Sequence, residues 1–284
     1  MRRDLAAVKL FVSCDLEGAA GIVDWSQCRP SGGAAYHEGC RLLLEEVNAA
    51  IEGGLAAGAT EVLVNDSHGA MANLPPDALA GEARYLSGRH KPRYMMEGLD
   101  DSFDAVFFVA YHGAMGTSGT LSHTYNPRAI HEVRLGGAPV GESGVNALVA
   151  SGCGVPIALV TGDQFTAEEA RPIAEGAEVV VVKQSRTRFS ASSLHPAEAR
   201  RAIRDGAARA LGKLRAGSLS PPALKPPARL EVEWLTSDMA ALACAVRGVE
   251  RAGDRLVAIE NDDPIACYES FVAAISITRS IVES

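Results

Sequence analysis

Short apolar runs alternate with helical patterns over the first two thirds of the chain. The runs have the length of strands and are rich in Val, Leu, Ile, Phe and Ala; they lie at 8–13, 61–65, 105–110, 157–161 and 178–183. Between the first two runs, apolar side chains recur at helical spacing at Leu42, Leu43, Val47, Ala50, Ile51 and Leu55. Gly58 follows, and the pattern predicts a helix over 39–57. Such alternation is typical of an α/β fold, a mostly parallel sheet flanked by helices.

The later part of the chain has a different pattern of predicted elements. A second helix is expected to begin near Glu142, whose charge a helix N-terminus favours, and to end at the glycines around Cys153. After residue 183 come a helical pattern over 195–214, a Pro-rich connector over 220–227 and a strand pattern over 229–234. We therefore expect an α/β domain at 1–185 and a second, smaller α+β domain at 186–284.

Composition narrows the class of partner. The formal net charge is −8 over 284 residues, whereas nucleic acids and anionic membranes favour clustered Lys and Arg, so neither is expected as a partner. The apolar runs are far shorter than the roughly 20 residues of a membrane-spanning helix. Asp4 and Lys9 interrupt the first apolar stretch, so no export signal is expected. The six cysteines include no C-x-x-C pair, and we expect reduced thiols in a cytoplasmic protein.

Side chains that can bind metals follow several of the predicted strands. Asp15 and Glu17 lie two apart just past the first strand, so both project to the same side of an extended chain. His68 follows the second strand, His112 follows the third, and Glu142 follows a turn. Taken singly, each has an ordinary explanation as a solvated loop acid or a core histidine. The carboxyl ends of the strands line one crevice in an open α/β sheet, so the set as a whole favours a metal site.

The type of these side chains indicates the metal. Mixed His and carboxylate ligands suit zinc or another borderline divalent ion, because calcium and magnesium sites are nearly all oxygen. Five ligands exceed the four of one tetrahedral zinc. With a bridging carboxylate such as Asp15 they suit two metals about 3.5–4 Å apart, as in aminopeptidases, phosphatases and nucleases.

Other polar residues are candidates for further roles. His123 follows a Gly-rich segment at 113–119 that can approach a ligand closely or move as a lid. Near a metal its imidazole can act as a general acid or base or stabilise developing charge; an exposed loop histidine is the alternative. Asp66 and Asp163 are expected either to orient a ligand histidine or to cap a helix. Ser143 lies in a G-E-S-G-V segment that lacks the last glycine of a nucleophile elbow, so a serine hydrolase is not expected.

These motifs closely resemble one known family, the DppA-type D-aminopeptidases, which form the M55 family of zinc metallopeptidases. The residues that carry the resemblance lie in SCDLEG (13–18), VNDSH (64–68), MEGLDD (96–101), YH (111–112), SH (122–123) and VGESGVN (140–146). The S-x-D-x-E-G stretch is the most distinctive. The resemblance runs from about Val8 nearly to the C-terminus.

The resemblance implies a site and an activity. Asp15 would bridge two zinc ions per subunit; Glu17, His68, His112 and Glu142 would complete the ligand set, and His123 would be the catalytic residue. It further implies a cytoplasmic homo-oligomer, a decamer of two stacked pentameric rings, that removes N-terminal D-amino acids such as D-Ala from short peptides.

Alternatives to this activity are a two-metal hydrolase of another class, a phosphoesterase or an amidase, and a non-catalytic homologue that binds metal or peptide. The motif segments contain no Arg or Lys cluster to clamp a phosphate, which counts against a phosphoesterase. The sequence departs from the family after His112, where an expected arginine is missing, and at Gln164, where a second acid is expected. Both departures concern substrate preference more than metal chemistry.

Overall fold

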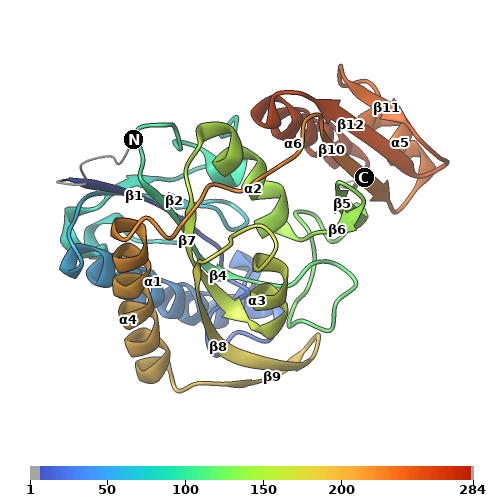
Figure 1. The fold of residues 1–284 in the computed structure, drawn as a ribbon. Helices are drawn as coiled ribbons and strands as arrows, with labels where there is room; N and C mark the ends of the chain where they lie inside the picture. The colour runs from blue at the N-terminus through green and yellow to red at the C-terminus, as the bar shows by residue number, and fades with distance from the viewer. Residues whose placement is uncertain (1–6, 283–284) are drawn as a thin grey trace.

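The structure is a computed structural model that describes residues 7–282; Asp4, on which part of the expectation about export depends, lies outside them. Within that range, seven strands form a sheet in the order β3-β2-β1-β4-β7-β8-β9 (Figure 1). The strands are β1 (Val8–Cys14), β2 (Ala59–Asp66), β3 (Arg84–Leu86), β4 (Ala105–Tyr111), β7 (Ile157–Asp163), β8 (Glu178–Thr187) and β9 (Ser190–Ser193). Among these strands, pairing is parallel except between β8 and β9. The predicted α/β fold with a mostly parallel sheet is confirmed.

Helices cover both faces of this sheet, which explains its continuous apolar runs. On one face lie α1 (Ala34–Ala56) and α4 (Pro196–Arg215), packed against Leu10 and Val12 of β1. Phe11 points to the opposite face, into the core beneath α2 (Glu142–Cys153). A shorter helix, α3 (Gln164–Ala170), follows β7. The side chain of Cys14 is buried on the α1 side, as the alternation along β1 predicts.

The predicted start and end of α2 are both confirmed. The helix begins at Glu142, directly after Gly141, and ends at Cys153. Gly154 has a left-handed backbone with φ of 68°, and its N–H donates to the carbonyls of Ala150 and Ser151. Glycine adopts this conformation without steric cost, so it ends the helix there.

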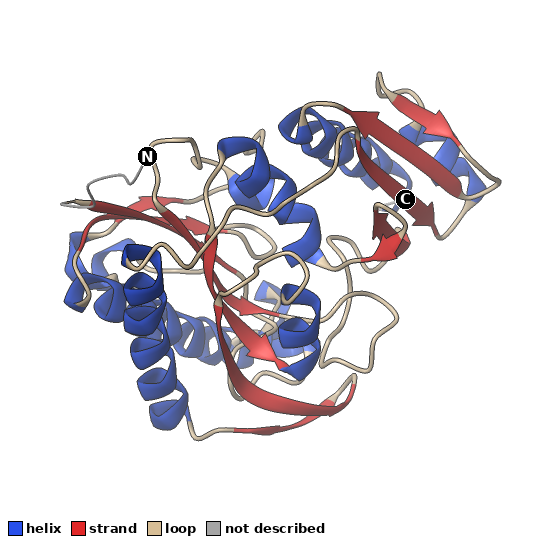
Figure 2. Cartoon of the chain, in the orientation of Figure 1, coloured by secondary structure: helices blue, strands red, loops and turns tan. Residues whose placement is uncertain are grey.

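A second, antiparallel sheet lies beside α2 (Figure 2). In the described part of the chain it has the strand order β11-β12-β10-β5-β6. Its strands are β5 (Ile130–Leu135), β6 (Ala138–Pro139), β10 (Ala228–Trp234), β11 (Val249–Arg251) and β12 (Leu256–Asn261), with the helices α5 (Ser237–Ala243) and α6 (Pro264–Val282). The buried side of β10 joins the core shared by α2 and α6. The fold therefore includes a second, smaller α+β unit, as the fold-class prediction has it. Each sheet takes strands from both sides of residue 185, because β5 and β6 of the antiparallel sheet precede it and β9 of the parallel sheet follows it.

Short 3-10 helices complete the described chain, at η1 (Trp25–Gln27), η2 (Pro30–Gly32), η3 (Pro76–Ala78), η4 (Ala80–Glu82) and η5 (Tyr94–Met96). All six cysteines lie within the described residues as free thiols. No helix in residues 7–282 has the length and apolar character needed to cross a bilayer.

Candidate metal centre

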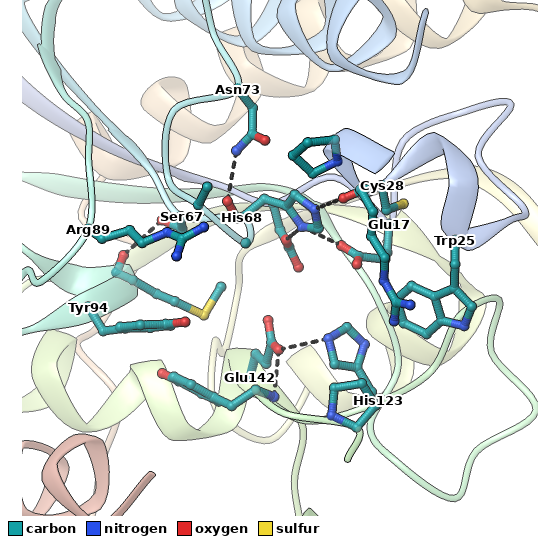
Figure 3. Close-up of a pocket in the computed structure, with 18 residues that line it drawn as sticks. Glu17, Trp25, Cys28, Ser67, His68, Asn73, Arg89, Tyr94, His123 and Glu142 are labelled. Carbon is teal, nitrogen blue, oxygen red and sulfur yellow. Dashed lines mark hydrogen bonds and ion pairs between the residues drawn. The ribbon is translucent and has the colours of Figure 1, made fainter. Parts of the chain in front are cut away.

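The strand order reverses between β1 and β4, and the candidate ligands meet at this point. From β1 the sheet continues through β2 on one side, and from β4 it continues through β7 on the other. Such a reversal opens a crevice beyond the carboxyl ends of the strands. Asp15 and Glu17 enter it from β1, His68 from β2 and His112 from β4, while Glu142 enters from the first turn of α2. The structure brings together all five residues and His123. Figure 3 shows Glu17, His68, His123 and Glu142 of this group.

Asp15 lies between two histidine–glutamate pairs. Its Oδ1 is 3.1 Å from Nδ1 of His68, and its Oδ2 is 3.1 Å from Nε2 of His112. Glu17 Oε2 lies 2.9 Å from the same nitrogen of His68, and Glu142 Oε2 lies 3.6 Å from that of His112. Each half of the site therefore has one histidine and one glutamate of its own, and the two halves share the Asp15 carboxylate.

The hydrogen bonds on the far side of each imidazole fix its orientation. His68 Nε2 lies 2.6 Å from the carbonyl oxygen of Cys28, and His112 Nδ1 lies 3.0 Å from that of Gly113. A carbonyl oxygen only accepts, so these nitrogens carry the hydrogen. In the neutral imidazoles, the other nitrogens then turn their lone pairs toward the carboxylates. Metal-binding histidines are commonly oriented in this way, by a hydrogen bond from the nitrogen that does not bind the metal.

The buried carboxylates of the site need a positive charge close to them. Among the described residues, Asp15 Oδ2, Glu17 Oε2 and His112 Nε2 are buried and lack a hydrogen-bond partner. Burial would raise the pKa of Asp15, but its contacts with His112 and His68 hold that pKa well below its ordinary value. Burial would lower the pKa of His112, but the charge of Glu142 and the contact with Asp15 hold that pKa well above its ordinary value. A divalent cation supplies the positive charge that the histidines otherwise carry as protons, so the donor set fits a metal.

His123 occupies a different position from the five other residues. Its Nε2 is 3.7 Å from Glu142 Oε1, and its Nδ1 lies 3.0 Å from the Leu121 carbonyl, to which it donates. The ring stacks on that of His112, with centroids 4.2 Å apart, and meets the edge of Trp25. Burial and the neighbouring His112 lower the pKa of His123, which favours a neutral ring. One potential ligand atom of each of His112, His123 and Glu142 lies within 4.8 Å of the other two, so His123 is placed either to bind a metal or to carry a proton.

A cavity of about 270 Å³, called here the inner cavity, opens onto the site. It is lined by Asp15, Glu17, His68, His123 and Glu142 and also by Trp25, Met95, Tyr94 and Tyr125. Metal-binding side chains together with aromatic rings suit a small ligand that has a group able to bind a metal and apolar side chains.

A buried hydrogen-bond network beneath the site accounts for other motif residues. Ser13 Oγ lies 2.7 Å from the Tyr111 hydroxyl and 2.9 Å from Ser67 Oγ, which joins β1 to β4 and to the segment after β2. Asn146 of α2 donates to the same tyrosine hydroxyl. The backbone N–H of Tyr125 donates to Glu142 Oε1 over 2.7 Å, which orients this carboxylate. The network holds the segments that carry the candidate ligands in a fixed relation.

The loop after β1 is held by close backbone contact and by a buried lysine. A Cβ at Gly18 would lie 1.8 Å from the carbonyl oxygen of Tyr111, so the S-x-D-x-E-G stretch needs glycine there. Lys183 of β8 donates from Nζ to the carbonyls of Glu17, Ala19 and Ile22. Sequence reasoning missed Lys183, since a lysine at the end of an apolar strand ordinarily points to solvent.

Asp163 and Asp66 accept hydrogen bonds that stabilise the segments that follow them. Asp163 caps α3 by accepting from the N–H of Thr166, which is the helix-cap interpretation. Asp66 accepts from the backbone N–H of Asn73, whose side chain donates to the His68 carbonyl. Asp66 thereby orders the loop that follows His68.

Comparisons with known proteins agree with this geometry. Residues 8–273 match the model of the M55 peptidase family, described as D-aminopeptidase. A D-aminopeptidase of Bacillus subtilis (strain 168) is 35% identical over 267 residues, which cover 93% of this chain and 96% of that protein. The solved structure of the Zn-dependent D-aminopeptidase DppA from Bacillus subtilis, a self-compartmentalizing protease, superposes with a TM-score of 0.90 at 33% identity, covering 96% of this chain and 98% of that one.

Proposed function

Since the chain belongs to the M55 family of D-aminopeptidases, we propose that it is a two-zinc metallo-aminopeptidase that removes N-terminal residues, D-amino acids such as D-Ala, from short peptides. The observation that carries this proposal is the Asp15 carboxylate shared between two histidine–glutamate pairs. The names of the relatives support the zinc and the D-amino acid substrate.

In this proposal, His68 and Glu17 would hold one zinc, His112 and Glu142 would hold the other, and Asp15 would contribute to both. Within the described residues, Asp15 Oδ2, Glu17 Oε2 and His112 Nε2 are buried without a hydrogen-bond partner, so they are available to bind a metal, which supports the assignment. When bound, zinc supplies a Lewis acid for the peptide carbonyl and lowers the pKa of water toward neutrality. The carbonyls of Cys28 and Gly113 keep the imidazoles of His68 and His112 turned toward the site.

His123 is proposed to carry the proton. Its Nδ1–H is engaged with the Leu121 carbonyl, so Nε2 of the neutral ring is left to accept a proton from the attacking water. The Glu142 carboxylate, 3.7 Å away, stabilises the imidazolium that forms. The same nitrogen then donates the proton to the leaving amine. Trp25, packed edge-on against the ring, limits the access of bulk water.

The size and chemistry of the inner cavity support a short peptide substrate. With metal bound, the site would accept the lone pair of a free N-terminal amine, which a blocked peptide does not offer. A cavity of about 270 Å³ holds a small ligand and excludes a folded protein.

We further propose a cytoplasmic homo-oligomer, a decamer of two stacked pentameric rings. The description of the Bacillus subtilis relative as self-compartmentalizing supports an assembly that encloses its active sites. The mass of the purified protein by light scattering tests this, with ten times 29.7 kDa expected; a stable monomer would contradict it.

Hydrolysis assays test the proposed reaction. Purified protein is stripped of metal, reloaded with zinc, and given D-Ala-D-Ala, L-Ala-L-Ala and p-nitrophenyl phosphate. We expect zinc-dependent cleavage of the peptides with a preference for D-Ala-D-Ala. Cleavage of the phosphate ester alone would instead indicate a phosphoesterase, and full zinc occupancy without any turnover would indicate a binding protein.

A further inference from the structure

Arginines from distant segments gather at the mouth of the inner cavity. Arg29 follows η1, Arg89 lies in the loop after β3, Arg128 precedes β5, and Arg279 lies in α6. They line a second cavity of about 450 Å³, called here the outer cavity. Arg29, Arg89, Tyr94 and Tyr125 line both cavities, so the two adjoin. This concentration of positive charge stands out in a chain whose net charge is −8.

Three of the arginines at the outer cavity form no ion pair in the described part of the chain, whereas several arginines elsewhere on the surface do. Arg41 and Arg229, for example, each pair with glutamates on the surface. Within residues 7–282, by contrast, no carboxylate lies within ion-pair distance of Arg29, Arg89 or Arg128. Arg29 lies over the Trp25 ring, 4.6 Å from its centroid, which holds its guanidinium at the boundary of the two cavities.

The two adjoining cavities therefore differ in chemistry. The inner cavity carries the candidate metal ligands Asp15, Glu17 and Glu142, and the arginines make the outer cavity basic. A short unblocked peptide has a matching arrangement, with an amine whose lone pair can bind a metal at one end and an anionic carboxylate at the other. The planar guanidinium fork matches a carboxylate in a bidentate geometry.

We propose that the outer cavity binds a carboxylate of the substrate peptide while the amine is held at the metal centre. The carboxylate is either the C-terminal one or that of an acidic side chain. The inference rests on the proposed aminopeptidase function and adds to it a substrate class: short peptides with a carboxylate a few bonds beyond the scissile amide. Arg89 and Arg128 then act as specificity residues that touch substrate away from the reacting atoms.

Steady-state kinetics of the zinc-loaded enzyme test this, using D-Ala-D-Ala, its C-terminal amide, and the C-terminal amide of D-Ala-D-Glu. We expect the amide of D-Ala-D-Ala to have a KM about 10-fold higher than the free acid, with a similar kcat. A low KM for the D-Glu amide identifies the side-chain carboxylate as an accepted ligand, and a high one restricts the outer cavity to the C-terminal carboxylate.

Variants assign the effect to the arginines. Arg89→Gln and Arg128→Gln are each expected to raise KM for D-Ala-D-Ala about 3-fold, and the double variant about 10-fold, without changing KM for its amide. Arg201→Gln is the matched control, because Arg201 is an exposed arginine of α4 that does not line either cavity. Equal KM values for free acid and amide in the wild type, or equal effects of the double variant on both substrates, would overturn the proposal.

Calorimetry separates this inference from the proposed function. N-acetyl-D-Ala-D-Ala has a blocked amine, so its binding to the zinc-loaded protein is measured without turnover. We expect it to bind about 10-fold more tightly than its C-terminal amide, and the double variant to lose this difference. If no peptide is cleaved by the wild type but this difference is present, the proposed function fails and the carboxylate site stands. Equal affinities would overturn the carboxylate site whatever the activity.

Discussion

Replacing Lys183 with methionine tests how the fold holds Glu17 at the metal centre. The lysine is 1% exposed, and its ammonium donates to the carbonyl oxygens of Ala19 and Ile22 over 3.2 and 2.8 Å and also to that of Glu17. Lys183→Met keeps a long apolar side chain but removes the donors. The loop that carries Glu17 then loses its attachment to β8.

The expected loss follows from two opposing terms. Leaving a buried carbonyl without a donor costs about 1–3 kcal/mol; Ala19 is affected least, because its carbonyl also accepts from the N–H of Ile22. The loss of the donor to all three carbonyl groups is therefore expected to destabilise the fold by roughly 5 kcal/mol. In the opposite direction, burial lowers the pKa of Lys183 from 10.5 to about 8, which shows that burying its charge costs free energy. Methionine carries no charge, so the substitution removes this cost, roughly 3 kcal/mol at about 1.36 kcal/mol per pKa unit. We therefore expect the free energy of unfolding to fall by about 2 kcal/mol.

The effect on zinc is expected to be larger than the effect on stability. Substitutions of residues that orient metal ligands typically weaken metal binding about 10- to 100-fold. Urea unfolding of the metal-free protein measures the first effect, and zinc titration against a chelator measures the second. Lys225→Met, at an exposed site in the Pro-rich connector, is the control and should change neither. Unchanged zinc affinity in Lys183→Met would refute the role assigned to this lysine, even if stability fell.

Further substitutions test the charges and roles within the site. Burial raises the pKa of Glu46 to about 7 from an ordinary 4.5, so its favourable contribution to stability is complete below pH 4.5 and lost as the pH rises past 7. At pH 8, urea unfolding of Glu46→Gln should accordingly give a higher free energy of unfolding than wild type, by up to about 3 kcal/mol. This difference should disappear toward pH 4.5, and a difference that does not change with pH would contradict the raised pKa of Glu46. Asp15→Asn is expected to lower the occupancy of both zinc sites, whereas Glu17→Gln should mainly lower that of one, as measured by the zinc content per chain in elemental analysis. Equal losses of zinc in the two variants would argue against a bridging Asp15. His123→Ala should keep its zinc while kcat falls about 10²- to 10⁴-fold, and loss of zinc in this variant would make His123 a ligand.

The strands and helices next to the site were predictable from local pattern. The strands β1, β4 and β7 are buried along almost their whole length, so their apolar runs are continuous and easy to recognise. Gly154 marks the end of α2 because a left-handed residue is needed there. The candidate ligands were predictable as a group because the carboxyl ends of parallel strands converge on one edge of a sheet.

Features set by contacts between distant segments could not be predicted from the same pattern. β5 is short and half exposed, and it pairs with β10 nearly a hundred residues later in the chain. Lys183 looks like the solvated end of an apolar strand until the loop of Glu17 folds over it. Arg89 and Arg128 lie outside the motif segments, and loop paths alone bring them to the same cavity. Periodicity reports local burial, whereas these positions depend on how loops close over long separations.

A zinc titration of the metal-free protein, with D-Ala-D-Ala hydrolysis and bound zinc measured at each point, tests the two-zinc centre most directly. Activity is predicted to rise with added zinc and to reach its plateau at two bound zinc ions per chain. A plateau at one zinc ion per chain, or hydrolysis that is unaffected by removal of metal, would contradict the assignment of Asp15 as a ligand shared between two metals.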